Sequence, residues 1–360
     1  MLQVLKRAPN LKSIVIKYRN DVVRLLELLF DNCVSIKRLE IKWCKLEDNT
    51  MCVLDKIVAF YPELEELKLV GCDELTPTVG STISQLRKLR RLNLSHNTDL
   101  SRYSIKIIVE NCTRLEELCL QRIDKMYDED VKHVISNIGA QLTTLKLDGI
   151  KLTDNSFCYL HHCTRLQVLD MTYCIQMTDK GLLEGIGALQ ELRSLSLRGA
   201  WNFTAQALST FLHRPAMASI IYLNLYICIT LDDYGLEGIA LRCVHLKTLT
   251  LGWCNKVTDA GIMKVICNCK KLQILELEGV ERITGTGYLD LVPTHLPLLK
   301  RLYLRSCEHI PQELLLKLVA AMPQLEVINH RGRIVSLLKE NFRYWISWKC
   351  RSLYHYSIGN

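Results

Sequence analysis

The stretch LKTLTLGWCNKVTDAGIMKVICNCKK, residues 246–271, decides the fold of this chain. Its first part keeps the spacing L-x-x-L-x-L, in which a short strand turns its three leucines to one face and the residues between them to the other. Thr258 and Asp259 then supply side-chain oxygens suited to capping a helix N-terminus. An apolar stripe follows at helical spacing, made of Ile262, Val265, Ile266 and Cys269. One strand and one helix cannot bury their apolar faces alone, so copies of the unit must stack.

The same unit recurs from one end of the chain to the other. From Leu11 to Leu325 is 314 residues over twelve intervals, about 26 residues per repeat, within the range of leucine-rich repeats. We therefore predict an α/β leucine-rich-repeat solenoid, a curved horseshoe with a parallel inner sheet and outer helices. The thirteen predicted repeats begin at Leu11, Ile36, Leu64, Leu89, Leu115, Leu142, Leu166, Leu192, Ile220, Leu246, Leu272, Leu299 and Leu325.

The two ends of the chain depart from the repeat. The apolar residues among 2–5 look like the helical half of a repeat, whose exposed edge we expect to be covered by something outside the chain. The pattern fails after Ile328, where His330 takes the place of a leucine that would face the core. The segment RIVSLLKENFRYWISWK then has mostly helical spacing, beginning at Ile334. We predict a solenoid over residues 1–330 and a capping helix and tail over 331–360, with a membrane-surface helix as the alternative.

Composition indicates a packed chain without a membrane or secretory signal. Apolar residues make up 49%, only 17 glycines and 8 prolines are present, and the formal charge of +8 is scattered. The charge does not favour nucleic acid over other partners, so none is predicted. Neither a signal-peptide core nor an apolar run of transmembrane length occurs, so we expect no membrane partner and a place in the cytoplasm or nucleus.

The sixteen cysteines follow the repeat rather than a disulfide framework. Eleven stand at two fixed places, where a free thiol facing the core behaves as a small hydrophobe. We therefore predict buried thiols and a reducing compartment. The eleven are Cys33, Cys44, Cys72, Cys112, Cys163, Cys174, Cys228, Cys243, Cys254, Cys269 and Cys307.

Motifs for catalysis or cofactors are missing from the sequence. No phosphate-binding loop, dinucleotide fingerprint, H-E-x-x-H or G-x-S-x-G occurs, so we predict no catalytic residues and no cofactor. Cys158, His161, His162 and Cys163 could be drawn as metal ligands, as could Cys267 with Cys269. Cysteine at the repeated helix-end position favours a core role, so we predict no metal site.

The inner surface, made of strand residues that point away from the core, is the candidate binding site. Aromatic and arginine side chains gather there in the later repeats, and these residue types carry much of the energy of protein interfaces. We expect Tyr226 and Arg305 to leave the core. Trp253 and Trp43 could instead pack at the strand end. The predicted partner-binding residues are Arg198, Tyr222, Tyr226, Trp253, Arg301, Tyr303 and Arg305.

The cysteine-containing repeat, with L-x-x-L-x-L-x-x-C, a Thr-Asp pair and an Asn-Cys helix end, resembles the repeats of F-box and leucine-rich-repeat proteins. It is seen in Leu246–Cys269, and in Leu166–Cys174 with Thr178 and Asp179. The resemblance implies repeats that hold a substrate for ubiquitylation, while an F-box binds a Skp-type adaptor on a cullin scaffold. Only ten residues precede Leu11, so we expect adaptor and cullin as partners only if an F-box lies upstream.

We therefore expect a protein-binding module that recognises the substrate of a Skp-cullin-F-box type ubiquitin ligase. One alternative is an F-box-less scaffold or inhibitor that binds a protein through the same concave face. Another is a receptor for an anionic small molecule such as an inositol phosphate.

Overall fold

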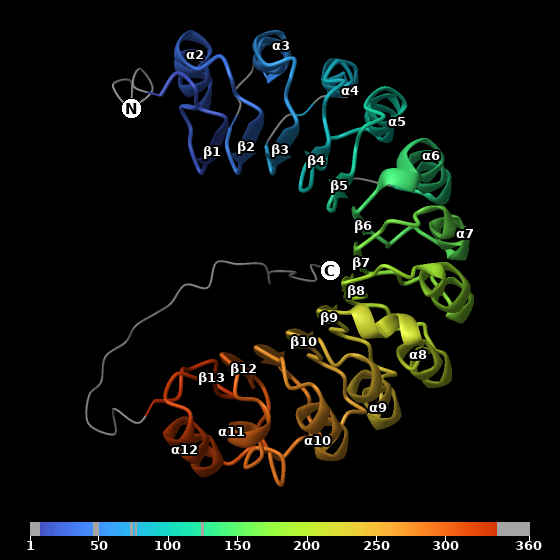
Figure 1. Cartoon of the computed structure of the whole chain (residues 1–360), viewed down its shortest axis with the longest axis vertical. Coiled ribbons are helices and arrows are strands. Elements are labelled where there is room, and N and C mark those ends of the chain that lie inside the picture. Colours follow the sequence, from blue (N-terminus) through green and yellow to red (C-terminus); the bar gives the residue numbers. More distant parts are fainter. Residues whose placement is uncertain (1–7, 46–49, 73–74, 76–77, 124–125, 337–360) are drawn as a thin grey trace, which may run out of the picture.

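The computed structural model describes residues 8–45, 50–72, 75, 78–123 and 126–336. Within them the chain forms thirteen parallel strands in one sheet, ordered from β1 to β13 as in the sequence. The strands line the inner side of an arc and the helices cover its outer side (Figure 1). The predicted α/β leucine-rich-repeat horseshoe is confirmed.

The elements alternate along the chain, one inner strand and one outer segment per repeat. The strands are β1 (Ser13–Lys17), β2 (Arg38–Lys42), β3 (Glu66–Val70), β4 (Arg91–Asn93), β5 (Glu117–Leu120), β6 (Thr144–Asp148), β7 (Val168–Thr172), β8 (Ser194–Ser196), β9 (Tyr222–Asn224), β10 (Thr248–Thr250), β11 (Ile274–Glu276), β12 (Arg301–Tyr303) and β13 (Glu326–Ile328). The α-helices are α2 (Val22–Asn32), α3 (Thr50–Phe60), α4 (Val79–Ile83), α5 (Arg102–Asn111), α6 (Asp128–Ile138), α7 (Asp154–Cys158), α8 (Ala205–Leu212), α9 (Asp233–Arg242), α10 (Asp259–Asn268), α11 (Val292–His295) and α12 (Gln312–Ala321). Shorter helical turns are η2 (Gly139–Gln141), η3 (Tyr159–His162), η4 (Gly181–Gly185), η5 (Ile186–Ala188) and η6 (Pro215–Ser219).

The leucines of the repeat lie in register between sheet and helices. Leu249 pairs with Leu223 on one side and with Leu275 on the other, and all three are buried. The apolar stripe of α10 faces the same interior, since Ile262, Val265 and Ile266 are also buried. One continuous apolar layer therefore runs the length of the solenoid.

The backbone turns sharply at a residue with positive φ where most strands end, and hydrogen bonds at this turn continue the pairing between repeats. Trp253 has a φ of 60° and donates its N–H to the Glu278 carbonyl of the next repeat at 2.7 Å. Gly279 occupies the equivalent place in that repeat, with a φ of +67°, and the Trp253 ring lies directly against it. Trp43 and Gly71 form the same pair near the other end. Both tryptophans pack at the strand end, as the alternative interpretation proposed, but each remains more than a third exposed.

The eleven cysteines at repeated positions are all buried and unpaired by disulfides, as predicted. Their thiols also form contacts between repeats, for example from Cys254 Sγ to the Leu225 carbonyl at 3.1 Å and from Cys307 Sγ to the Leu277 carbonyl at 3.0 Å. Burial raises the pKa of Cys269 to about 12. The Cys269 thiol therefore stays protonated and unreactive at neutral pH.

The Thr-Asp pair has a wider role than the sequence predicts. Thr258 caps α10, because its side chain accepts the Ala260 N–H. Asp259, predicted to cap the same helix, instead accepts the Thr284 N–H at 2.9 Å and hydroxyl at 2.5 Å in the next repeat. Aspartate–threonine bridges of this kind also join Asp128 to Thr153, Asp154 to Thr178, Asp179 to Thr204 and Asp233 to Thr258.

The last repeat is shifted by one residue from its predicted register. Val327, not Ile328, pairs with the core residue Leu302, and Val327 is fully buried while Ile328 lies on the inner face. The prediction that Ile328 and position 330 are core positions was therefore wrong. Ile334, predicted to begin a helix, forms an antiparallel bridge with Ile328. The predicted C-terminal helix from residue 337 onward, and the half repeat at residues 2–5, lie outside the described residues.

No described helix is long and apolar enough to cross a membrane. Among the same residues no three His, Cys, Asp or Glu side chains are grouped to hold a metal ion. The rings of His161 and His162 lie 3.9 Å apart, and His161 Nδ1 contacts the Cys158 carbonyl.

Candidate functional site

The inner face offers three side chains per repeat. Two flank the core leucine within the strand, and the third stands two residues after the second of them. In the repeat of β9 these positions are Tyr222, Asn224 and Tyr226, and in the repeat of β12 they are Arg301, Tyr303 and Arg305. The strand register therefore aligns the predicted binding residues in rows that cross the repeats.

A compact group of these residues lies across β7 to β12, and we call it the arginine–tyrosine cluster. It consists of Tyr173, Arg198, Tyr226, Glu278 and Arg305. The Arg198 guanidinium carbon lies 5.6 Å from the ring centroid of Tyr173 and 4.8 Å from that of Tyr226. A cation against aromatic faces is attracted by the ring quadrupoles, which fixes the guanidinium between the two rings.

Carboxylates close the cluster on its C-terminal side. Arg305 Nε lies 3.8 Å from Glu278 Oε1. Burial raises the pKa of the Glu278 carboxyl, although Arg305 and Arg198 act in the opposite direction. Burial, together with the negative charge of Glu278, also raises the pKa of Glu276. These acids lie in a partly desolvated surface where a new donor or cation would be favoured.

A third half-buried carboxyl lies on the N-terminal side, on β7. Burial raises the pKa of Asp170 despite the nearby Lys146 charge. Its Oδ1 atom is buried and has no hydrogen-bond partner within the described part of the chain. A buried acceptor without a partner is unfavourable, so this part of the face would gain from a donor supplied by another molecule.

The structure brings most of the predicted binding residues together. Arg198, Tyr226 and Arg305 are members of the cluster. Tyr222 lies beside it, half-buried, and its pKa is raised mainly by burial. Tyr303 points inward next to Glu276 in the strand register. The remaining two lie at the margins: Trp253 at the strand-end turn, and Arg301 on the exposed edge, where its Nε is 3.6 Å from Glu326.

The expectation that Tyr226 leaves the core was wrong. Only 6% of Tyr226 is exposed. The neighbouring repeat has Gly252 at the aligned position, where an added Cβ would come within 2.5 Å of the tyrosine ring. The Tyr226 ring therefore packs against Gly252, which has no side chain to exclude it, and Arg198 covers the ring on its other side. Arg305 does project, with 64% of its side chain exposed.

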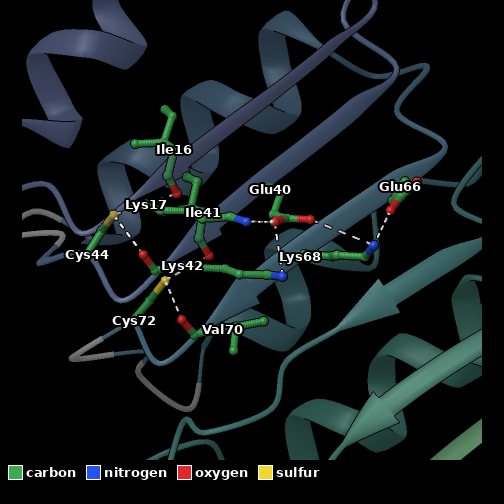
Figure 2. Close-up of polar contacts among 10 residues, drawn as sticks. All are labelled: Ile16, Lys17, Glu40, Ile41, Lys42, Cys44, Glu66, Lys68, Val70 and Cys72. Carbon is green, nitrogen blue, oxygen red and sulfur yellow. Dashed lines mark hydrogen bonds and ion pairs between the residues drawn. The ribbon is translucent and has the colours of Figure 1, made fainter. Parts of the chain in front are cut away.

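The early repeats carry a different surface, which we call the lysine–glutamate network (Figure 2). Its members lie on strands β1 to β4 and are Lys17, Glu40, Lys42, Glu66, Lys68 and Arg91. Glu40 lies 3.0 Å from Lys42 Nζ, 3.5 Å from Lys17 Nζ and 3.8 Å from Lys68 Nζ. Glu66 contacts Lys68 Nζ at 2.5 Å and Arg91 Nε at 2.9 Å.

The network stabilises the charged forms of Glu40 and Lys68. Burial alone would raise the pKa of Glu40, but the hydrogen bond from Lys42 and the three lysine charges hold it below its usual value. Burial would lower the pKa of Lys68, but the Glu66 hydrogen bond and the surrounding carboxylates raise it. The sequence analysis missed this network, because Lys17 and Glu40 become neighbours only when β1 and β2 pair; an alternation of charges at inward strand positions was the available signal.

Comparisons with known proteins agree with the repeat architecture. A family model described as Leucine Rich repeat matches residues 242–265. Over 214 residues, 59% of the chain, the sequence is 28% identical to F-box/LRR-repeat protein 4 of Bos taurus, and the match spans 30% of that protein. Over 100 residues, 26% of the chain, it is 33% identical to lysine-specific demethylase 2A of Xenopus tropicalis, of which it spans 9%. The matches thus cover less than a third of either relative.

A solved structure shares the fold. One chain of the crystal structure of the Rad7 and Elc1 complex in yeast superimposes with a TM-score of 0.74 at 18% identity, covering 92% of this chain and 83% of that one. The chain thus has the leucine-rich-repeat fold and is similar to the F-box and leucine-rich-repeat proteins, as its cysteine-containing repeats predict. Repeats of this kind indicate a binding module rather than a catalytic centre.

Proposed function

We propose that this chain binds a protein partner through the inner face of its later repeats and serves as the substrate-recognition part of a Skp-cullin-F-box type ubiquitin ligase. The arginine–tyrosine cluster is the observation that carries the proposal. It combines a guanidinium held between two rings with half-buried carboxylates and an exposed arginine, Arg305. Such partly desolvated aromatic and arginine groups are where the binding energy of protein interfaces concentrates.

The ligase assignment is supported by the F-box/LRR-repeat relative. In this proposal the chain contributes recognition and the transfer of ubiquitin is carried out by other subunits. Contact with a Skp-type adaptor and a cullin would require an F-box in the same protein. The corresponding location is the cytoplasm or the nucleus. A scaffold or inhibitor that binds through the same face without ubiquitin transfer is the alternative.

Proximity labelling of living cells with the chain fused to a biotin ligase tests the binding surface. Tyr303→Ala combined with Arg305→Ala should lower capture of the principal partner by well over tenfold, because interface anchors of this kind each contribute about 2 kcal/mol or more. The matched control is Lys264→Ala with Lys270→Ala, which removes two exposed side chains from α10 and the turn after it on the outer side. Equal capture by the concave-face variant and the wild type would place binding elsewhere.

The turnover of the captured partner separates the ligase from the scaffold. If the chain recognises a ligase substrate, the partner's half-life should lengthen when the chain is depleted and should not be restored by the Tyr303/Arg305 variant. A half-life independent of the chain, with binding intact, would favour the scaffold or inhibitor.

A further inference from the structure

The inner face of the early repeats carries an excess of positive charge that the proposed function does not use. Its twelve inward positions, three in each of the first four repeats, hold five cations and two carboxylates. The carboxylates are Glu40 and Glu66. The cations are Lys17, Arg38, Lys42, Lys68 and Arg91.

The two carboxylates lie deeper than the cations around them. The side chains of Glu40 and Glu66 are 17% and 14% exposed, whereas the four cations paired with them are 28–49% exposed. A molecule that approaches this face therefore meets ammonium and guanidinium groups first. The carboxylates act from beneath, where they hold the cations in place.

Holding the cations in place favours binding of an anion. Glu40 lies within ion-pair distance of Lys17, Lys42 and Lys68, so three like charges are kept close together by one opposite charge. Long lysine side chains lose rotamer freedom when they bind a ligand, and here part of that loss has already occurred on folding. The carboxylates around Lys68 also raise its pKa, so this lysine carries its charge at neutral pH.

The shape of the surface also admits a side chain. A hollow of about 320 Å³ opens on the same face, lined by Ser13, Val15, Arg38, Glu40 and Glu66 among others. Among the described residues Arg38 makes no ion pair, and it is exposed. Its guanidinium could therefore pair with a carboxylate that stays at the rim of the hollow.

Peptide carboxylates fit this surface better than a nucleic acid does. None of the twelve inward positions carries an aromatic side chain on which a base could stack. The nearest tryptophan, Trp43, has its ring against Gly71 and 5.0 Å from the His96 ring. The recessed glutamates would also repel a continuous phosphate backbone, while separate carboxylates can alternate with them.

We propose that the lysine–glutamate network binds an acidic segment, rich in Asp and Glu, of the same protein partner that contacts the arginine–tyrosine cluster. This inference rests on the proposed function. Three strand spacings separate β4 from β7, about 14 Å at roughly 4.8 Å each. An extended linker of about four residues would therefore join the two contacts. The partner would lie with its acidic end toward the early repeats.

Fluorescence anisotropy with a labelled (Glu-Ser)₄ peptide and the full chain tests the charge recognition. Lys17→Gln with Lys42→Gln should weaken binding about tenfold at low ionic strength, since it removes two of five cations. Lys68 remains beside Glu40 in this variant, so no carboxylate is left without a counter-charge. Lys106→Gln with Lys264→Gln, on the outer helices α5 and α10, removes the same charge and should leave affinity unchanged.

Two results would overturn the inference. One is equal loss of affinity in the inner-face and outer-face variants, which would reduce the effect to net charge. The other is tighter binding of a single-stranded oligonucleotide of equal charge than of the peptide at the same salt concentration. A (Gln-Ser)₄ peptide should show no binding.

Capture of the cellular partner distinguishes this inference from the proposed function. If both are right, partner capture falls with Lys17→Gln and Lys42→Gln as well as with Tyr303→Ala and Arg305→Ala. Capture lost only in the second pair overturns the acidic-segment inference alone. Capture retained in both pairs overturns the proposed function.

Discussion

The early and late repeats share one backbone design but present opposite kinds of inner surface. In the lysine–glutamate network, carboxylates such as Glu40 are stabilised in their charged form by surrounding lysines, and the pKa falls. Around the arginine–tyrosine cluster, partial burial and the negative charge of Glu278 raise the pKa of the Glu276 carboxyl. The repeat thus fixes where side chains stand, while the residues at the inward positions decide what each surface can bind.

The largest loss of stability should come from truncating core leucines. It should be the same in both halves, because the early and late repeats differ in their inner surfaces and not in their core. Leu67→Ala in β3 and Leu249→Ala in β10 each truncate a fully buried leucine of the same row. Each should lower the free energy of unfolding by about 2–5 kcal/mol. Urea denaturation followed by circular dichroism would measure it. A loss confined to one half would show that the two regions differ in packing as well as in surface.

A smaller effect, again shared, is expected at the strand-end turns. Gly71→Ala and Gly279→Ala would each place a methyl group within 2.5 Å of a tryptophan ring at a positive φ. The left-handed backbone alone costs about 1–3 kcal/mol for a residue other than glycine. Gly332→Ala is the matched control, since its φ is +70° but its nearest neighbour is 3.9 Å away. Thermal midpoints should fall further for the first two than for the control.

The smallest effect should differ in sign between the halves. At pH 7 Glu40→Gln should lower the thermal midpoint and Glu276→Gln should raise it, each by the equivalent of about 1 kcal/mol or less. A carboxyl whose pKa is lower in the folded than in the unfolded state stabilises the fold at any pH above its unfolded-state pKa. This stabilisation is lost as the pH falls through the folded-state pKa. A raised pKa destabilises the fold at pH 7, and this is relieved as pH falls through the raised value.

Midpoints measured from pH 7 to pH 3 would check these signs. The difference between Glu276→Gln and wild type should shrink first as the pH falls, because that carboxyl has the higher pKa. The Glu40→Gln difference should persist to lower pH. The same sign for both variants at pH 7 would remove the electrostatic contrast between the two surfaces.

Several features of the binding surface depended on neighbours that lie a whole repeat away. Tyr226 was predicted to project, but Gly252 in the next repeat and Arg198 in the previous one leave space for its ring and cover it. Asp259 was assigned to its own helix, but the parallel stacking places Thr284 within reach. A strand pattern identifies the face of a residue, whereas its burial depends on what stands beside it.

The sequence by itself determined the architecture. Leucines at L-x-x-L-x-L spacing, a cysteine three residues later and an apolar helical stripe specify a unit that is stable only when stacked, and its period predicted every repeat as far as Leu299. The tertiary structure alone decided the last register, where one fewer residue before Val327 aligns it with Leu302. It also decided the two inner surfaces, because Lys17, Glu40 and Lys68 lie far apart in sequence and interact only after parallel strands pair.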